Sequence, residues 1–197
     1  MLRGGKVIAR QPVEVTAASA SVQGPASVEA GAPFEVRWTG PNYTADWLAI
    51  RRPTAADSDG AYGELIRADA TAPGKLTAPV EPGRYELRYV LRGGKVIARQ
   101  AVGVTKAVAR LRAPARAVAG SSIEIGWSGP NYANDWLAIR APQASDGDGA
   151  YGQIIHAQAR PPGRLTAPQQ PGDYELRYVL RGAKVIARRP LTVIPAK

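Results

Sequence analysis

Short segments of alternating apolar and polar residues run along the whole chain. The segment from Phe34 to Trp38 alternates with period two, and the segments 46–51 and 85–91 do the same. This period is typical of a β-strand with one buried face, and it points the side chains of Trp38 and Tyr85 inward. Turn residues separate these segments, and no stretch has a helical period. The pattern therefore predicts an all-β chain.

The pattern occurs twice, at a shift of 89 positions. The run WTGPNY that begins at Trp38 returns as WSGPNY at Trp127, and the runs DWLAI and YELRYVL recur at the same shift without insertions. Two copies this similar share one fold. About seven short strands in about 90 residues is the size of an immunoglobulin-like sandwich. We predict two tandem Ig-like β-sandwich domains, at residues 17–105 and 106–197, with an extra N-terminal strand.

The first residues of the chain belong to the same pattern. The run LRGGKVIARQ at positions 2–11 reappears at 91–100 and, nearly unchanged, at 180–189. Residues 1–16 are therefore predicted to be the last strand of a preceding repeat. An apolar strand without a sheet is a pairing hazard, so we expect it to join an edge of its own first domain or to link chains by strand addition. The alternative is the trimmed end of a longer chain, without a role. The side chains that would make the strand addition are Val7, Ile8, Val13 and Val15.

A Trp and a Tyr form the predicted core of each domain. With no Cys in the chain, the inter-sheet disulfide of antibody domains is absent, so Trp38 and Trp127 serve as core centres unaided. Tyr85 and Tyr174 follow a Pro-Gly turn at the start of the penultimate strand, where such folds place a tyrosine whose hydroxyl bonds back to the backbone. Asp46, and Asp135 in the second copy, are interpreted as structural latches held by loop amides.

One candidate binding face lies on the outward side of the strand 46–51. An exposed Trp beside Arg is typical of protein interfaces and of patches that contact glycans or polyanions. The alternative is that the Trp packs on the Arg stems and on a loop, or covers the domain junction. The residues of this predicted face are Trp47, Arg51, Arg88, Trp136, Arg140 and Arg177.

Alternating carboxylates in one loop of each repeat resemble the start of a calcium site. The candidate ligands are Asp57, Asp59, Asp146 and Asp148. Neither loop supplies the bidentate Glu expected at its far end, and polar hairpin turns use the same residues. We therefore predict no metal site and no cofactor.

Charge and composition exclude several classes of function. Lys and Arg outnumber Asp and Glu by 26 to 16 in 197 residues, and the chain has one His and no Cys. A Ser-His-Asp triad, Cys-ligated zinc and thiol catalysis have no residues to use, so we predict no enzyme. The basic residues are spread over both repeats, which favours at most non-specific attraction to polyanions over a specific nucleic-acid site. We expect no membrane insertion, because no stretch approaches the length of a membrane span.

Taken together, the motifs WxGPN, DWLAI, GAYG, PGxYELRYVL and KVIAR resemble the Ig-like repeats of bacterial proteins that carry a von Willebrand factor type A domain. The match covers both repeats and the N-terminal strand. It implies a tandem accessory module that lies outside the cytoplasm, in the periplasm or on the cell surface. This chain has no A domain, so the magnesium-dependent adhesion motif of that domain has no counterpart here.

These observations predict a non-enzymatic spacer and protein-binding or adhesion module of a bacterial envelope or surface protein, assembling by strand addition through residues 1–16. Its partner would be a protein, including a second copy of itself. The alternative is a binding module for an anionic polymer or glycan that uses the Trp/Arg faces. The join at residues 104–108 lacks a Gly/Ser-rich or Pro-rich spacer, which favours a stiff two-domain rod.

Overall fold

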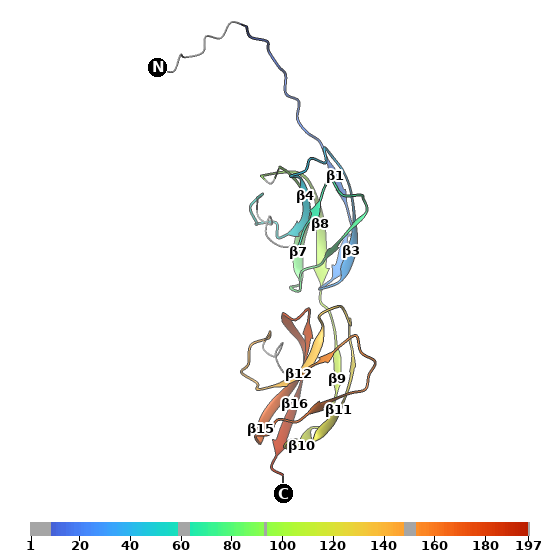
Figure 1. Cartoon of the computed structure of the whole chain (residues 1–197), viewed down its shortest axis with the longest axis vertical. Helices are drawn as coiled ribbons and strands as arrows, with labels where there is room; N and C mark the ends of the chain where they lie inside the picture. The colour runs from blue at the N-terminus through green and yellow to red at the C-terminus, as the bar shows by residue number, and fades with distance from the viewer. Residues whose placement is uncertain (1–8, 59–63, 93, 148–152, 197) are drawn as a thin grey trace, which may run out of the picture.

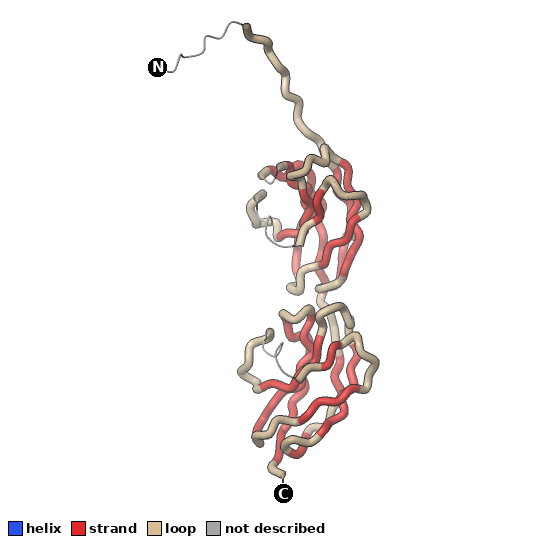
Figure 2. Tube along the Cα trace, in the orientation of Figure 1, coloured by secondary structure: helices blue, strands red, loops and turns tan. Residues whose placement is uncertain are grey.

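The computed structural model describes residues 9–58, 64–92, 94–147 and 153–196. Within these ranges every helix or strand is a β-strand, which confirms the predicted all-β class (Figure 2). Two sandwiches stand end to end (Figure 1). We call them repeat 1 (residues 17–105) and repeat 2 (residues 106–197). No helix that could cross a membrane is found among the described residues.

The two repeats contain matching sets of strands. The strands of repeat 1 are β1 (Ser21–Gln23), β2 (Ser27–Glu29), β3 (Pro33–Thr39), β4 (Trp47–Arg51), β5 (Ile66–Arg67), β6 (Gly74–Thr77), β7 (Gly83–Leu91) and β8 (Lys95–Thr105). The strands of repeat 2 are β9 (Arg110–Arg112), β10 (Arg116–Val118), β11 (Ser122–Ser128), β12 (Trp136–Arg140), β13 (Ile155–His156), β14 (Gly163–Thr166), β15 (Gly172–Leu180) and β16 (Lys184–Ile194).

Each repeat is built from two sheets. In repeat 1 the strand orders are β1-β3-β6 and β2-β8-β7-β4-β5, and in repeat 2 they are β9-β11-β14 and β10-β16-β15-β12-β13. Paired strands are antiparallel, except that the short β2 and β10 run parallel to the last strands β8 and β16. The last strand therefore has neighbours on both sides, β7 and β2 in repeat 1 and β15 and β10 in repeat 2.

The core of each sandwich lies between its sheets. The alternation of residues 34–38 is the burial pattern of β3, with Phe34 and Trp38 inside. Trp38 donates its indole N–H to the carbonyl of Ala68 over 3.0 Å, and Trp127 does the same toward Ala157 over 3.1 Å. These bonds satisfy the polar end of each ring, so the Trp can fill the core without an unpaired donor.

The tyrosine at the start of β7 and of β15 ties the preceding turn to the sheet. The hydroxyl of Tyr85 donates to the carbonyl of Glu81 over 2.9 Å, and that of Tyr174 donates to the carbonyl of Gln170 over 3.1 Å. Both bonds reach four residues upstream, which is the corner that the sequence suggests. Tyr85 is buried and Tyr174 is half-buried.

The N-terminal segment leaves repeat 1 at the end opposite to repeat 2 (Figure 1). Residues 9–16 form no strand, and the side chains of Val13 and Val15 are 81% and 89% exposed. The segment therefore does not join an edge of its own domain in this structure. Val7 and Ile8 lie outside the described residues, and strand addition to another molecule stays a prediction.

Candidate functional site

The expectation of an exposed Trp/Arg face is wrong for four of its six residues. Trp47 is 3% exposed and Arg88 is 0% exposed, and Trp136 and Arg177 are equally buried. Trp47 packs with Ala49, Val90, Leu65 and Val96 on the outer face of the five-stranded sheet. Alternation identifies that face correctly, but a second layer of side chains and loop covers it.

Arg88 holds the loop that follows β4 against this face. Its Nη1 donates to the carbonyls of Ala55 (2.9 Å) and Ala56 (3.1 Å), and its Nη2 to those of Arg52 (3.0 Å) and Pro53 (3.1 Å). Its Nε donates to Glu86 Oε2 over 3.0 Å. A guanidinium has five N–H donors, so every donor of this buried cation is used.

Arg177 repeats the arrangement in repeat 2. Its bonds run to the carbonyls of Ala141, Pro142, Ala144 and Ser145 and to the carboxylate of Glu175. A cation with all its donors engaged inside the protein is not available to a polyanion or a glycan. The two buried arginines are therefore loop anchors rather than binding residues.

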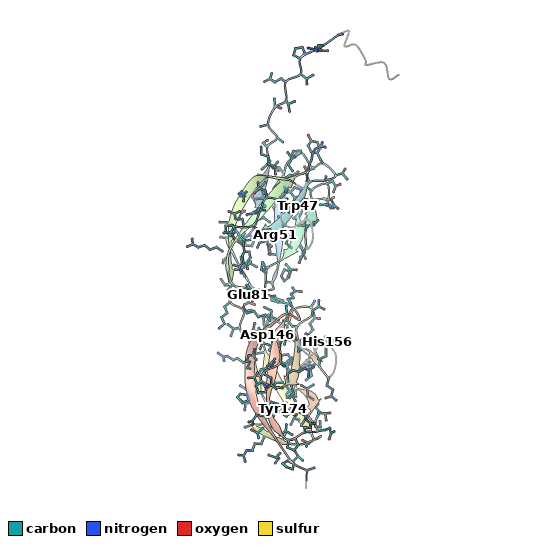
Figure 3. All side chains as sticks on the ribbon, turned by 90° about the vertical axis from the view of Figure 1, so that its left-hand side faces the viewer. Trp47, Arg51, Glu81, Asp146, His156 and Tyr174 are labelled. Carbon is teal, nitrogen blue, oxygen red and sulfur yellow. The ribbon has the colours of Figure 1, made fainter. Side chains whose placement is uncertain are left out.

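Arg51 and Arg140 remain partly exposed at the ends of β4 and β12 (Figure 3 labels Arg51). Each donates from Nη1 to the carbonyl of the residue before it, Ile50 or Ile139, over 2.7 Å. Without Trp47 and Trp136 beside them they do not form the Trp/Arg patch that the sequence suggests.

Asp46 is a latch between two loops. Its Oδ2 accepts bonds from the Tyr43 amide (3.0 Å) and the Tyr89 hydroxyl (2.9 Å), and its Oδ1 accepts one from the Arg92 amide (2.8 Å). Burial, together with the bond to Asp46, raises the pKa of Tyr89 to about 12. Asp135 makes the same bonds in repeat 2. The carboxylate is fully buried and satisfied, which fits the structural role assigned to it from the sequence.

The candidate calcium ligands that the structure describes are engaged in other bonds. Asp57 accepts from the Val96 amide and pairs with Arg99, and these contacts hold its pKa below the usual range. Asp146 (Figure 3) pairs with Arg188 and accepts from the Val185 amide. Asp59 and Asp148 lie outside the described residues. Among the described residues, no group of His, Cys, Asp and Glu is placed to hold a metal ion.

The two repeats meet through polar contacts. The Tyr132 hydroxyl donates to Glu29 Oε1 over 2.9 Å, and Arg181 Nε donates to the carbonyl of Gly31 over 2.8 Å. Lys184 forms an ion pair with Glu81, which Figure 3 shows at the end of repeat 1 that faces repeat 2. We call the surface formed by Glu29, Gly31 and Glu81 the C-terminal pole of repeat 1. The N-terminal pole of repeat 2 is the facing surface, formed by Tyr132, Leu180, Arg181 and Lys184.

Apolar packing reinforces the junction. Leu180 lies in the β15–β16 hairpin of repeat 2, yet it packs into the core cluster of repeat 1 and is fully buried. Gly31 has a φ of +74°, and a Cβ there would lie 3.1 Å from Leu180 Cδ1. Burial and the bond to Glu29 raise the pKa of Tyr132 to about 12. The joint is thus a packed interface with ordered polar contacts, and not a bare linker.

Sequence reasoning missed this junction. Glu29 and Tyr132 are 103 residues apart. Glu29 belongs to none of the repeated motifs, and Tyr132 ends the run WSGPNY, which identifies the repeat but not this contact. One signal was available, because the 89-residue shift pairs Glu29 with Val118 and Glu81 with Gln170. These two exchanges, among the positions at which the repeats differ, replace the carboxylates through which repeat 1 contacts repeat 2.

Comparison with known proteins adds three solved structures. SGBP-B of the Bacteroides ovatus mixed-linkage glucan utilization locus, solved with a mixed-linkage heptasaccharide, is 19% identical over 85% of this chain and 42% of that one, at a TM-score of 0.27. The titin domains z1z2, solved with telethonin, are 15% identical over 93% of this chain and 100% of that one, at 0.27. The ICAM-5 D1-D4 ectodomain fragment is 14% identical over 88% of this chain and 53% of that one, at 0.28.

These comparisons do not define a family or a ligand. The chain spans less than two thirds of the SGBP-B and ICAM-5 chains. No family model matches the chain, and no curated protein matches it. The class of protein that the strands themselves define is a tandem Ig-like β-sandwich protein.

Proposed function

We propose that the chain is a non-enzymatic tandem Ig-like module that acts as a spacer and protein-binding element of a bacterial envelope or surface protein. The observation that carries the proposal is the ordered junction between Glu29, Gly31 and Glu81 on one side and Tyr132, Arg181 and Lys184 on the other. A spacer works by fixing the distance and orientation of what it connects, and side-chain contacts on both sides of a short join do this. The bacterial, extracytoplasmic setting rests on the motif resemblance alone.

The buried ionisable groups support a structural role over catalysis. Asp46, Arg88, Asp135 and Arg177 are the buried polar residues of the described chain, and each has its hydrogen bonds satisfied by loops and strands. Catalytic groups instead need a free donor, acceptor or lone pair that faces a substrate. The Trp/Arg faces that would bind a glycan or polyanion are closed, because four of their six residues are buried on the outer face of the sheet under the loop that follows β4 or β12.

Protein binding is assigned to the N-terminal segment. Val13 and Val15 match Val102 and Val104 of β8, which are 2% and 4% exposed. A segment whose counterpart buries two valines between sheets favours insertion into a sandwich or addition to a sheet edge. Pro12 does not oppose this, because Pro190 occupies the same position in β16 and lies opposite Glu175 in the sheet.

Two solution measurements test the proposal. Small-angle scattering of the whole chain should give the profile of a rigid rod, and two independently tumbling globules would contradict the spacer. Sedimentation of the whole chain and of a chain without residues 1–16 tests the binding segment. Concentration-dependent association that disappears with the deletion supports strand addition, whereas identical profiles at all concentrations remove self-assembly through this segment.

A further inference from the structure

We propose that the N-terminal pole of repeat 1, formed by Tyr43, Leu91, Arg92 and Lys95, docks the C-terminal pole of another Ig-like repeat with carboxylates at the positions of Glu29 and Glu81. The inference rests on the proposed function as a tandem module and names the partner surface of that module. The occupant is an Ig-like sandwich whose last strand is supplied by the segment 6–16.

The N-terminal pole of repeat 1 has the same residues as the N-terminal pole of repeat 2. Tyr43, Leu91, Arg92 and Lys95 are the counterparts, at the 89-residue shift, of Tyr132, Leu180, Arg181 and Lys184. Those four residues make the junction with repeat 1. Repeat 1 thus carries at its N-terminal end the same four side chains that repeat 2 places at the junction.

The polar side chains of the N-terminal pole of repeat 1 are exposed in this structure. Tyr43 is 45% exposed and Arg92 and Lys95 are exposed, whereas Tyr132, Arg181 and Lys184 are partly buried by the junction. Within the described part of the chain, the Tyr43 hydroxyl and the Lys95 ammonium have no polar partner. The Arg92 guanidinium stacks over the Tyr43 ring at 4.4 Å, much as Arg181 lies over Tyr132 at 5.1 Å. The pole is therefore pre-organised in its docking arrangement while its donors face solvent.

Charge complementarity identifies the partner surface that fits this pole. Tyr132 and Lys184 meet the carboxylates of Glu29 and Glu81. The C-terminal pole of repeat 2 has Val118 and Gln170 at these positions, and Val118 is 41% exposed. The C-terminal pole of repeat 2 cannot supply these carboxylates. The N-terminal pole of repeat 1 therefore selects a partner repeat that has Glu at both positions, and not the C-terminal end of a second copy of this chain.

The N-terminal segment connects to repeat 1 in the same way as β8 connects to repeat 2. The segment 6–16 matches β8, and β1 begins five residues after Thr16, just as β9 begins five residues after Thr105. A sandwich that includes this segment as its last strand is therefore joined to repeat 1 by a linker of the same length as the one between repeats 1 and 2. That linker brings the two poles together in the observed junction, as Figure 1 shows for repeats 1 and 2.

A three-repeat chain tests the proposal. Residues 17–90 are fused ahead of Leu2 of the whole chain, so that the segment 6–16 completes the added body. In the three-repeat chain, Y43F in the copy of repeat 1 that follows the segment 6–16 should lower the unfolding midpoint. The shift should equal the one that Y132F produces in the two-repeat chain. In the present chain Y43F should produce no shift, because its hydroxyl has no partner there.

The matched control exchanges only the pole. Residues 106–179 of repeat 2, fused ahead of Leu2, again allow the segment 6–16 to complete the added body. In this fusion Val118 takes the place of Glu29 opposite Tyr43, and Gln170 takes the place of Glu81 opposite Lys95. In that chain Y43F should leave the midpoint unchanged, and scattering should show a looser first joint than in the chain that carries Glu29 and Glu81. Equal joints, or equal Y43F shifts, in the two fusions would overturn the proposal.

Hydrogen exchange distinguishes strand formation by the N-terminal segment from docking through the N-terminal pole of repeat 1. Slow exchange at Val13 and Val15 in a fusion means that the segment has become a strand, as the proposed function requires. Slow exchange together with a Y43F midpoint that does not move rejects the docking pole and leaves the strand intact. Fast exchange at both valines in both fusions rejects the strand, and the docking proposal fails with it.

Discussion

Arg88→Ala removes the buried cation that anchors the loop after β4. Each hydrogen bond to a charged group contributes about 1.5–3 kcal/mol, and loss of one partner from a buried ion pair costs about 3–5 kcal/mol. The five bonds of Arg88 do not add in full, because most residues of the loop are exposed and water can replace part of what its carbonyls lose. We expect a loss of about 3–5 kcal/mol from repeat 1, which is well below the sum of about 7.5–15 kcal/mol that five independent bonds would give.

Urea unfolding followed by circular dichroism and Trp fluorescence measures this loss. A change of that size lowers the melting midpoint of a domain of about 90 residues by more than about 10 °C. Arg177→Ala should act equally on repeat 2. Arg84→Ala is the matched control, because Arg84 is an exposed arginine on the same strand and should change stability by less than about 0.5 kcal/mol.

The outcome separates the two interpretations of the Trp/Arg face. A loss below about 1 kcal/mol for Arg88→Ala would refute the anchor role, because the ion pairs of a surface-exposed arginine typically contribute no more than about 1 kcal/mol to the free energy of unfolding. Arg88→Lys sharpens the test. Lysine keeps the charge but has only three donors in place of five, so it should recover a minor part of the stability.

Three further outcomes are expected. Gly31→Ala and Gly120→Ala should each cost about 1–2 kcal/mol, because both have a left-handed φ, but only Gly31→Ala should also loosen the junction as seen by scattering. The pKa of Tyr132 is higher in the folded state than in the unfolded state, so its contribution to the free energy of unfolding is complete below pH 10 and lost by about pH 12. Urea titrations at pH 8, 10 and 11 measure this loss of stability. Tyr132→Phe should make the free energy of unfolding depend less on pH over that range. A chelator and excess calcium should give the same melting midpoint, since Asp57 and Asp146 are ion-paired; a calcium-dependent rise would contradict this.

The repeat and the strand pattern could be predicted because both are local properties of the sequence. Period-two alternation places Trp38 and Tyr85 inside, and the 89-residue shift carries the assignment to the second domain. The same alternation states only which side of the sheet Trp47 and Arg88 occupy. It does not reveal that a loop returns over that side, because the loop is held by carbonyls, which every residue has.

The junction could not be predicted from one repeat at a time. Glu29 and Tyr132 have ordinary surface identities, and their contact depends on how two folded bodies meet. The useful signal was the difference between the copies, in which Glu29 becomes Val118 and Glu81 becomes Gln170. Residues that the two repeats share build the common fold, and exchanged residues such as these distinguish their surfaces.

Residual dipolar couplings of the whole chain in a weakly aligned medium test the fixed orientation of the repeats most directly. If Tyr132, Arg181 and Lys184 hold repeat 2 on repeat 1, both repeats report one alignment tensor, with equal magnitude and parallel axes. Y132F combined with Lys184→Gln should make the two tensors diverge. Tensors that already differ in magnitude in the unmodified chain would show independent motion of the repeats and would contradict the spacer.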